Sequence, residues 1–277
     1  MIRPPRTNPT APPRGALGMS ESVPDDDVSA IELSIVIPAY NESAGLRDAV
    51  MAALGYLDDR GLDGEVIVVN DGSADGTAQI ADALAQDHAR VRAEGYARNR
   101  GKGHAVRHGV RQARGAAIVF LDADLATPVG EIDKVLPAIA AGAQMVVGTR
   151  VHPEAEIEHP QPTVRRFMGG VFRSLARTML GLRTSDITCG FKAFTRDAAH
   201  RLFTPATIDG WAFDAELLVI AQRLGIRVVE VPVRWTDRRD SRVRPLRNAL
   251  ESWRQLRLIR RRMREGAYEP GGANHQA

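Results

Sequence analysis

The chain has one cysteine, Cys189, among its 277 residues. A lone thiol cannot form an internal disulfide or a cysteine-rich metal site, so we expect a reducing compartment and interpret Cys189 as a packed thiol. No apolar run reaches the roughly 18 residues that a membrane-spanning helix needs. Residues 1–30 contain prolines and charges but no apolar segment, which argues against a signal peptide and predicts a disordered tail.

Several common signatures are also absent. No G-x-G-x-x-G follows the first predicted strand and no G-x-x-x-x-G-K-[ST] loop occurs, which argues against a dinucleotide fingerprint and a phosphate loop. His104 and His108 lack the glutamate of an H-E-x-x-H zinc motif, so we interpret them as part of a solvated helix face. Neither zinc-finger spacing nor basic segments interleaved with aromatics point to nucleic acid.

The charge of the chain is unevenly distributed. Its composition, 44% hydrophobic and 26% charged, is that of a soluble globular protein, and the net charge is +3. Residues 242–264 hold nine arginines and one acid, Glu251, so this segment carries +8 and the remainder carries −5. A charge this concentrated indicates a local anionic partner.

Apolar runs alternate with segments of helical period from residue 33 onward. Buried strands are predicted at 33–38, 65–69, 116–121, 144–149 and 227–233. Helices are predicted over 43–57, 73–86, 102–114 and 128–141. This alternation indicates an α/β fold with a mostly parallel sheet that helices cover on both faces.

Polar clusters follow three of these strands: "PAYNE" after the first, "NDGSADGT" after the second and "DAD" after the strand at 116–121. Ligands of such sheets bind at the carboxyl ends of the strands. Asp122 and Asp124 are hard oxygen ligands, suited to Mg²⁺ or Mn²⁺ shared with substrate phosphates. The alternatives are solvated loop acids for "DAD", turn and cap chemistry for "NDGSADGT", and a surface lysine for Lys102 in "NRGKGHA".

Taken together, these motifs resemble the family 2 glycosyltransferases of the GT-A fold, and within them the dolichyl-phosphate β-glucosyltransferase group. The resemblance covers residues 33 to about 262 and is carried by "IVIPAYNE", "VVNDGSADGT", "NRGKGHAVRHG", "FLDADLATP", "VVGTR", "CGFKAFTRDAAHRLF", "GWAFDAELLVIAQRLG" and "VPVRW". The first motifs are shared by the whole superfamily. "DADLATP", "CGFKAFTRDAA" and "WAFDAELL" are more specific to polyprenyl-phosphate sugar synthases.

The resemblance implies a role for each matching position. It implies that the nucleotide and donor contact Pro38, Ala39, Tyr40, Glu42, Asn70, Asp71, Lys102, Asp122 and Ala123. It implies that Asp124, with Asp122, binds the metal, and that Asp214 of "WAFD" is at the reaction centre and, like Asp124, catalytic. It implies further that Arg150 and either Arg165 or Arg166 face the donor or acceptor phosphates. Arg234 and Arg239 are further candidates for binding the acceptor phosphate.

Two positions depart from the resembled pattern. Asn70 stands where the superfamily usually has the first aspartate of "DDGS", which puts a carboxylate's role there in doubt. Ala126 stands where mannosyl-phosphate synthases typically carry a glutamine that binds the metal. The second departure resembles the glucosyl group and favours glucose over mannose, hence UDP over GDP.

The implied reaction is inverting transfer of glucose from UDP-glucose to a polyprenyl phosphate. A phosphate monoester is mostly dianionic at neutral pH, since its second pKa is near roughly 6, so no general base is required. Asp214 is therefore expected to position the substrate, with proton abstraction, or a helix N-terminal acid, as the alternatives. Other possibilities are mannosyl transfer from GDP-mannose, a soluble phosphorylated acceptor, and a non-enzymatic nucleotide-sugar binding protein.

The basic segment is predicted to form an amphipathic helix over 244–264. Its apolar stripe is Leu246, Leu250, Trp253, Leu256, Ile259 and Met263. Flanking arginines suit an anionic membrane surface, whereas the alternative is a helix that packs its stripe on the catalytic domain. We therefore expect a disordered tail at 1–30, a catalytic domain at 31–243, the basic helix at 244–264 and a disordered tail at 265–277. We expect the protein to be cytoplasmic and peripheral to the inner face of the cell membrane.

Overall fold

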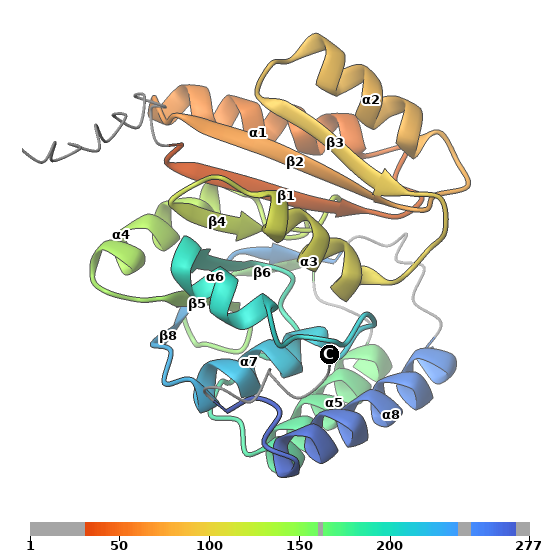
Figure 1. Cartoon of the computed structure of the whole chain (residues 1–277), viewed down its shortest axis with the longest axis vertical. Helices are drawn as coiled ribbons and strands as arrows, with labels where there is room; N and C mark the ends of the chain where they lie inside the picture. The colour runs from red at the N-terminus through yellow and green to blue at the C-terminus, as the bar shows by residue number, and fades with distance from the viewer. Residues whose placement is uncertain (1–30, 160–162, 238–244, 270–277) are drawn as a thin grey trace, which may run out of the picture.

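Figure 1 shows the computed structural model, which describes residues 31–159, 163–237 and 245–269. The predicted tail at 1–30 lies outside the described residues, as do residues 270–277 of the predicted C-terminal tail. Residues 265–269 are described: Tyr268 is buried, and its hydroxyl donates to Glu216 Oε1 at 2.8 Å. The predicted start of a disordered tail at residue 265 is therefore wrong.

Seven strands form the central sheet in the order β3-β2-β1-β4-β7-β5-β8. Their bounds are β1 Leu33–Ala39, β2 Gly64–Asp71, β3 Val91–Tyr96, β4 Ala117–Phe120, β5 Met145–Thr149, β7 Lys192–Thr195 and β8 Val228–Pro232. β7 is antiparallel to both of its neighbours, and the other pairs are parallel. The short strands β6 (Ile157–His159) and β9 (Trp235–Thr236) pair separately. The predicted mostly parallel sheet is confirmed.

The helices lie on both faces of this sheet (Figure 1). They are α1 Leu46–Arg60, α2 Thr77–Asp87, α3 Lys102–Gln112, α4 Val135–Ala140, α5 Thr163–Leu180, α6 Arg196–Phe203, α7 Phe213–Arg223 and α8 Pro245–Arg264. Alternate residues of β1 enter different cores: Val36 packs with α3, whereas Ile35 and Ile37 pack with α1. Side chains of a strand alternate between the two faces, which is why each strand contributes to both cores.

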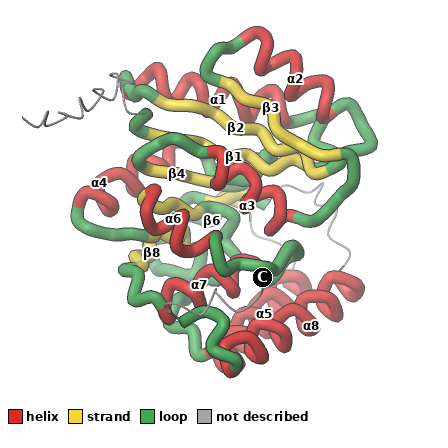
Figure 2. The backbone as a smooth tube through the Cα atoms, viewed as in Figure 1, coloured by secondary structure: helices red, strands yellow, loops and turns green. Residues whose placement is uncertain are grey.

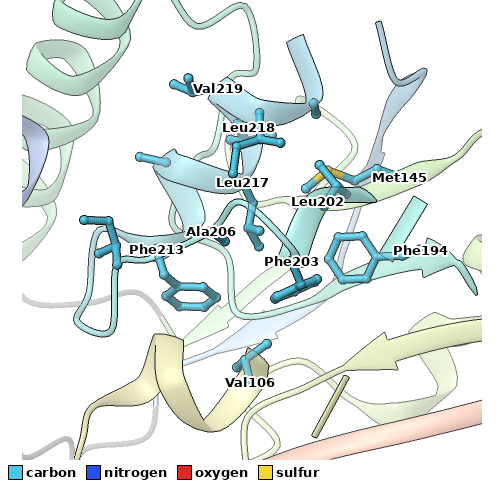
Figure 3. Packing of buried hydrophobic residues seen from close by; sticks show 14 of the residues in the cluster. Val106, Met145, Phe194, Leu202, Phe203, Ala206, Phe213, Leu217, Leu218 and Val219 are labelled. Atoms are coloured by element: carbon cyan, nitrogen blue, oxygen red, sulfur yellow. The ribbon is translucent and has the colours of Figure 1, made fainter. Parts of the chain in front are cut away.

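The core on the α3 face joins segments that are far apart in the sequence. Figure 3 shows Phe213 of α7 near Val106 of α3, with Phe203 of α6 and Phe194 of β7 beside them. The ring centroids of Phe194 and Phe203 are 5.4 Å apart in an edge-to-face arrangement. This packing fixes the start of α7 against α3.

The predicted helix at 128–141 is divided in two. A 3₁₀ helix, Val129–Lys134, precedes α4. Pro137 explains the division, because proline lacks an amide hydrogen and is tolerated only in the first turn of an α-helix. Starting α4 at Val135 places Pro137 in that first turn.

The predicted C-terminal helix is present as α8, and its apolar stripe is used in two ways. Leu256 and Ile259 are buried in the core on the α3 face, and Met263 packs partly against it, while Trp253 is 40% exposed. The side chains of Leu246 and Leu250 lie outside the described residues. Among the described residues, no helix combines the length and apolarity needed to cross a membrane.

Candidate active site

The three predicted polar clusters follow the carboxyl ends of β1, β2 and β4, which are parallel neighbours in the sheet (yellow in Figure 2), so the clusters lie at one edge. The first two loops are joined by hydrogen bonds: the Asn41 amide donates to Ser73 Oγ at 2.9 Å, and the Glu42 amide donates to Thr77 Oγ1 at 2.8 Å. Asn41 adopts a positive φ of 55°, which a short polar side chain tolerates. The sequence clusters thus form one surface.

Asp75 strengthens this connection between the two loops. Its carboxylate accepts hydrogen bonds from the amides of Thr77, at 3.0 Å, and Ser43, at 3.3 Å. Burial acts to raise the pKa of Asp75, but these hydrogen bonds outweigh it and lower the pKa to about 2. Asp75 is therefore ionised at neutral pH and holds the ends of β1 and β2 together.

Asp71 organises the loop that leads into α3. Its buried carboxylate accepts from the Tyr96 hydroxyl at 2.8 Å, from Asn99 Nδ2 at 2.9 Å and from the Arg100 amide at 2.8 Å. Asn70, beside it, uses its side-chain oxygen to accept from the Ser73 amide at 3.1 Å. The predicted contacts of Asn70 and Asp71 with a nucleotide remain predictions, and the observed contacts define the shape of the surrounding loops.

Asp122 and Lys102 form the centre of the site. Lys102 Nζ lies 2.5 Å from Asp122 Oδ1, and it also lies 5.7 Å from the ring centroid of Trp211. Burial lowers the pKa of Lys102, but the carboxylates of Asp122 and Asp214 outweigh this effect, so the pKa is raised and the side chain is a cation. The backbone of Gly190 approaches so closely that a Cβ there would lie 2.0 Å from Asp122 Oδ2.

Asp124 lies at the exposed end of the "DAD" motif. Its Oδ1 accepts the Ala126 amide at 3.0 Å, and the intervening Leu125 has a positive φ of 50°. In the part of the chain that the structure describes, no group of three or more His, Cys, Asp or Glu is arranged to hold a metal. Asp122 and Asp124 nevertheless fit a hard divalent cation, since Mg²⁺ sites commonly use one or two carboxylates and take their other ligands from water and substrate phosphates.

Asp214 lies in the first turn of α7 and faces a buried lysine. Its Oδ1 lies 2.6 Å from Nζ of Lys192, which is 0% exposed and which donates to the Cys189 carbonyl at 2.6 Å. Burial raises the pKa of Asp214, while the charges of Lys192 and Lys102 oppose that increase. The predicted reaction-centre acid therefore has a fixed partner and adjoins the Lys102–Asp122 pair.

Arg150 forms a second polar cluster beyond the end of β5. Its Nε and Nη2 bind the buried Asp186 at 2.7 and 3.0 Å, and Nη2 also donates to Thr188 Oγ1 at 2.9 Å. The guanidinium carbon lies 5.4 Å from the ring centroid of Trp235. Burial raises the pKa of Asp186, but the bonds from Arg150 outweigh it and hold that pKa far below its ordinary value.

Of the other predicted phosphate-binding arginines, the structure describes the side chain of Arg234. Arg234 is exposed, and its Nη2 lies 3.6 Å from Glu131 Oε1. The side chains of Arg165, Arg166 and Arg239 lie outside the described residues. Arg173 of α5, which the sequence motifs did not single out, lies near this cluster: burial lowers its pKa, Asp186 raises it and Arg150 lowers it further.

The remaining predicted donor residues lie at the ends of β1 and β4. Pro38, Ala39 and Ala123 are buried, Tyr40 is exposed and Glu42 is half-buried. Gly45, which follows this segment, is close to the third loop, since a Cβ there would lie 3.7 Å from the Ala123 carbonyl oxygen. The backbone after β1 thus adjoins the "DAD" motif, and Tyr40 offers a ring to solvent there.

A family model described as Glycosyl transferase family 2 matches residues 34–203. The chain belongs to glycosyl transferase family 2. The predicted identification is confirmed, and the protein is a glycosyltransferase.

Relatives in this family match most of the chain. The dolichyl-phosphate beta-glucosyltransferase of Mus musculus is 38% identical over 267 residues, which cover 91% of this chain and 82% of the relative. The Drosophila melanogaster protein of the same name is 36% identical and covers 88% of this chain and 78% of the relative. A solved structure of Mycobacterium tuberculosis glucosyl-3-phosphoglycerate synthase with Mn²⁺, UDP-glucose and phosphoglyceric acid has a TM-score of 0.59 at 23% identity, over 86% of this chain and 80% of that chain. The fold is GT-A, as predicted.

Sequence reasoning about this glycosyltransferase missed several residues of the site: Gly190, Lys192, Arg173, Asp186 and Trp235. The sequence does contain an indication that Lys192 has a partner. Lys192 interrupts the apolar run "FKAF", and a lysine inside a buried strand needs a group that compensates its charge. Asp186 and Trp235 had none, since nothing local to either residue indicates that Arg150 is its partner.

Proposed function

We propose that this glycosyltransferase transfers glucose from UDP-glucose to a polyprenyl phosphate, with inversion at the anomeric carbon and release of UDP. The observation that carries the proposal is the Lys102–Asp122 pair beside Asp124 at the carboxyl end of β4. This combination provides hard oxygen ligands and a cation at one place, as a nucleoside diphosphate leaving group requires. The names of the relatives at 36 to 38% identity supply the sugar and the acceptor class.

Aspartate and lysine side chains near the ends of the strands would have distinct roles in this reaction. Lys102 would neutralise charge that develops on the leaving diphosphate, and Asp122 would orient that lysine through their 2.5 Å contact. Asp124, with Asp122, would hold Mg²⁺ or Mn²⁺, and the bound ion would supply further electrostatic stabilisation of the diphosphate. Asp71 and Asp75 would keep the surrounding loops in position through their hydrogen bonds.

The acceptor phosphate would bind at the Arg150 cluster. The hydrogen bonds of Arg150 with Asp186 and Thr188 use Nε and Nη2, and none among the described residues uses Nη1. That edge of the guanidinium, together with Arg173, would face the phosphate, and Arg165, Arg166, Arg234 and Arg239 remain further candidates. Because the phosphate is already dianionic at neutral pH, attack on the sugar needs no general base.

The proposed sugar rests on the segment after "DAD". Ala126 is buried, and its amide is used to bind Asp124 Oδ1 at 3.0 Å. An alanine side chain has no ligand atom, which supports the glucosyl pattern over the mannosyl one. GDP-mannose and a soluble phosphorylated acceptor are the alternatives that the assay below includes.

The proposed location is the surface of an anionic membrane, on the cytoplasmic face, through α8. Trp253 and five arginines are exposed on this helix: Arg254, Arg257, Arg260, Arg261 and Arg264. At 3.6 residues per turn, these positions share one side of the helix. An aromatic ring among basic residues is suited to the boundary between headgroups and acyl chains. A lipid acceptor makes such a surface useful, since the enzyme would meet its substrate there.

The test is a substrate panel with the purified full chain. UDP-glucose and GDP-mannose, radiolabelled in the sugar, are each incubated with polyprenyl phosphate in mixed micelles or with 3-phosphoglycerate, in the presence of Mg²⁺ or Mn²⁺. We expect label in the organic phase with UDP-glucose and polyprenyl phosphate only. Label that follows GDP-mannose, or that stays in a water-soluble phosphoglycerate product, would contradict the proposed sugar or acceptor.

A further inference from the structure

Lys192 is a buried cation that none of the roles above uses. It occupies the first position of β7, its side chain is 0% exposed, and its Nζ lies 5.7 Å from the ring centroid of Phe120. The ammonium group is 2.6 Å from Asp214 Oδ1 and 2.6 Å from the Cys189 carbonyl oxygen. With no exposed surface, this ammonium cannot itself contact a substrate, so any effect on the reaction must pass through Asp214.

Asp214 connects this lysine to the centre of the site. The charged groups that act on Asp214 come from three elements: Lys192 of β7, Lys102 of α3, and Asp122 after β4. Lys102 in turn lies 2.5 Å from Asp122 Oδ1. With both carboxylates ionised, Lys192, Asp214, Lys102 and Asp122 alternate in sign, and their formal charges sum to zero.

The backbone holds Asp214 and Lys102 close together. The Gly103 amide donates to the Asp209 carbonyl at 2.8 Å, and a Cβ on Gly103 would lie 2.6 Å from Phe213 Cβ. The first turns of α3 and α7 are thus packed against each other without space between them. A change in the orientation of the Asp214 carboxylate would be transmitted to the Lys102 ammonium.

We propose that Lys192 is a positioning residue of the glycosyltransferase reaction, which fixes the Asp214 carboxylate as an anion and thereby aims Lys102 at the leaving diphosphate. This proposal rests on the proposed function, because activity is measured as glucosyl transfer to polyprenyl phosphate. Structure alone does not require the pair, since apolar side chains of similar volume that replace both members of a buried ion pair often leave stability unchanged. On this view Asp214 contributes charge and does not take up a proton.

The proposal predicts a change in the pH dependence of activity that a lysine with only a structural role would not cause. Burial raises the pKa of Asp214, and Lys192 is the first of the two cations that oppose this increase. Removing Lys192 therefore raises that pKa further, so Asp214 becomes protonated at higher pH as the solution is acidified. The acid limb of the kcat/KM profile should move to higher pH in Lys192→Met and stay near its original position in Lys192→Arg.

The experiment measures kcat and KM for UDP-glucose between pH 5 and 9, at saturating metal and polyprenyl phosphate, in the wild type and both variants. For Lys192→Met we expect a kcat about 100-fold lower at pH 7, a smaller change in KM, and a shift of the acid limb by about one pH unit or more. For Lys192→Arg we expect a kcat within about tenfold of wild type, since the cation is retained. Lys134→Met is the control for the loss of a lysine that pairs with a carboxylate. Lys134 Nζ lies 2.6 Å from Glu131 Oε2, and neither residue belongs to the cluster around Asp214. An unshifted acid limb in Lys192→Met overturns the proposal.

Folding and substrate identity are controlled separately. If Lys192→Met folds poorly, the double variant Lys192→Met/Asp214→Asn removes both charges; we expect its thermal stability to recover and its activity to stay low. Recovery of activity along with stability would overturn the proposal. A carboxyl ¹³C NMR titration of Asp214 without substrate gives the same comparison independently of turnover. A wild type that makes no glucosyl lipid, with Asp214 still titrating higher in Lys192→Met, would contradict the proposed function but support the part of the inference that concerns the Lys192–Asp214 pair.

Discussion

Gly190 lies against the Asp122 carboxylate so closely that a Cβ on Gly190 would be 2.0 Å from Oδ2. The contact joins the loop before β7 to the end of β4. Since the same carboxylate holds Lys102 through its other oxygen, the glycine determines where both charged groups can lie.

The first prediction concerns this glycine. Gly190→Ala should displace the Asp122 carboxylate and with it Lys102, and lower kcat/KM by about 100-fold, as misplacement of a catalytic group by about 1 Å can do. Steady-state kinetics with UDP-glucose and polyprenyl phosphate measure the effect. Gly130→Ala, in the 3₁₀ helix that follows "DAD", is the control because a Cβ there meets nothing within 4 Å. Equal losses in both variants would contradict the prediction.

The second prediction concerns the metal. Asp124→Asn should lower kcat/KM by about 100-fold or more, because an amide is a weaker ligand than a carboxylate for Mg²⁺ or Mn²⁺. Treatment of the wild type with EDTA should abolish turnover, and added Mn²⁺ should restore it. Asp87→Asn, at the exposed end of α2, should behave as wild type. Full activity of the wild type in EDTA would exclude a metal-dependent mechanism.

The third prediction concerns Asp186 and folding stability. Asp186→Asn leaves the Arg150 guanidinium without its carboxylate and should lower the free energy of unfolding by about 3 kcal/mol at pH 7. Thr188→Val removes only one neutral partner of the same guanidinium and should cost about 1 kcal/mol. Urea denaturation of the three proteins measures both values.

The pH dependence of this loss has a defined sign. Asp186 has its pKa held far below the ordinary value of 3.8, so it stabilises the folded state above about pH 4 and loses this contribution as the pH falls toward the folded-state pKa. The difference in stability between wild type and Asp186→Asn should therefore shrink as the pH falls below about 4. A difference that stays constant down to pH 2.5 would show that the carboxylate charge is not responsible.

The fourth prediction concerns the exposed face of α8. Deleting the helix is not a clean test, because Leu256, Ile259 and Tyr268 are buried and the deletion would open the core. The triple variant Arg254→Glu/Arg257→Glu/Arg264→Glu changes exposed side chains only. It should weaken binding to vesicles with 30% phosphatidylserine by more than about 100-fold, since each basic residue contributes roughly 1 kcal/mol.

Sedimentation with vesicles measures this binding. Arg47→Glu, on the exposed side of α1, controls for charge reversal in general and should sediment as wild type. Neutral phosphatidylcholine vesicles should bind neither protein strongly. Equal sedimentation of wild type and triple variant with anionic vesicles would overturn the proposed membrane surface.

The sequence predicted the parts of this molecule that depend on local patterns. The strands at 33–38, 65–69, 116–121, 144–149 and 227–233 are all present, because runs of apolar residues between polar turns leave few alternatives. β3 was missed because "VRAEGY" is an edge strand with a mostly half-buried pattern. β7 was missed because a four-residue strand, "KAFT", has no periodicity to read.

The residues of the site also fall into those that local sequence patterns predicted and those that only the tertiary structure revealed. The sequence by itself determined that Asp71, Asp122 and Asp124 lie at strand ends, since parallel strands bring such residues to one edge. Only the tertiary structure decided that Lys192 binds Asp214 and that Arg150 binds Asp186. The insertion of β7 between β4 and β5, antiparallel to both, carries Gly190 and Lys192 to the edge where Asp122 lies. Contacts of this kind join residues that are distant along the chain, and no local pattern specifies them.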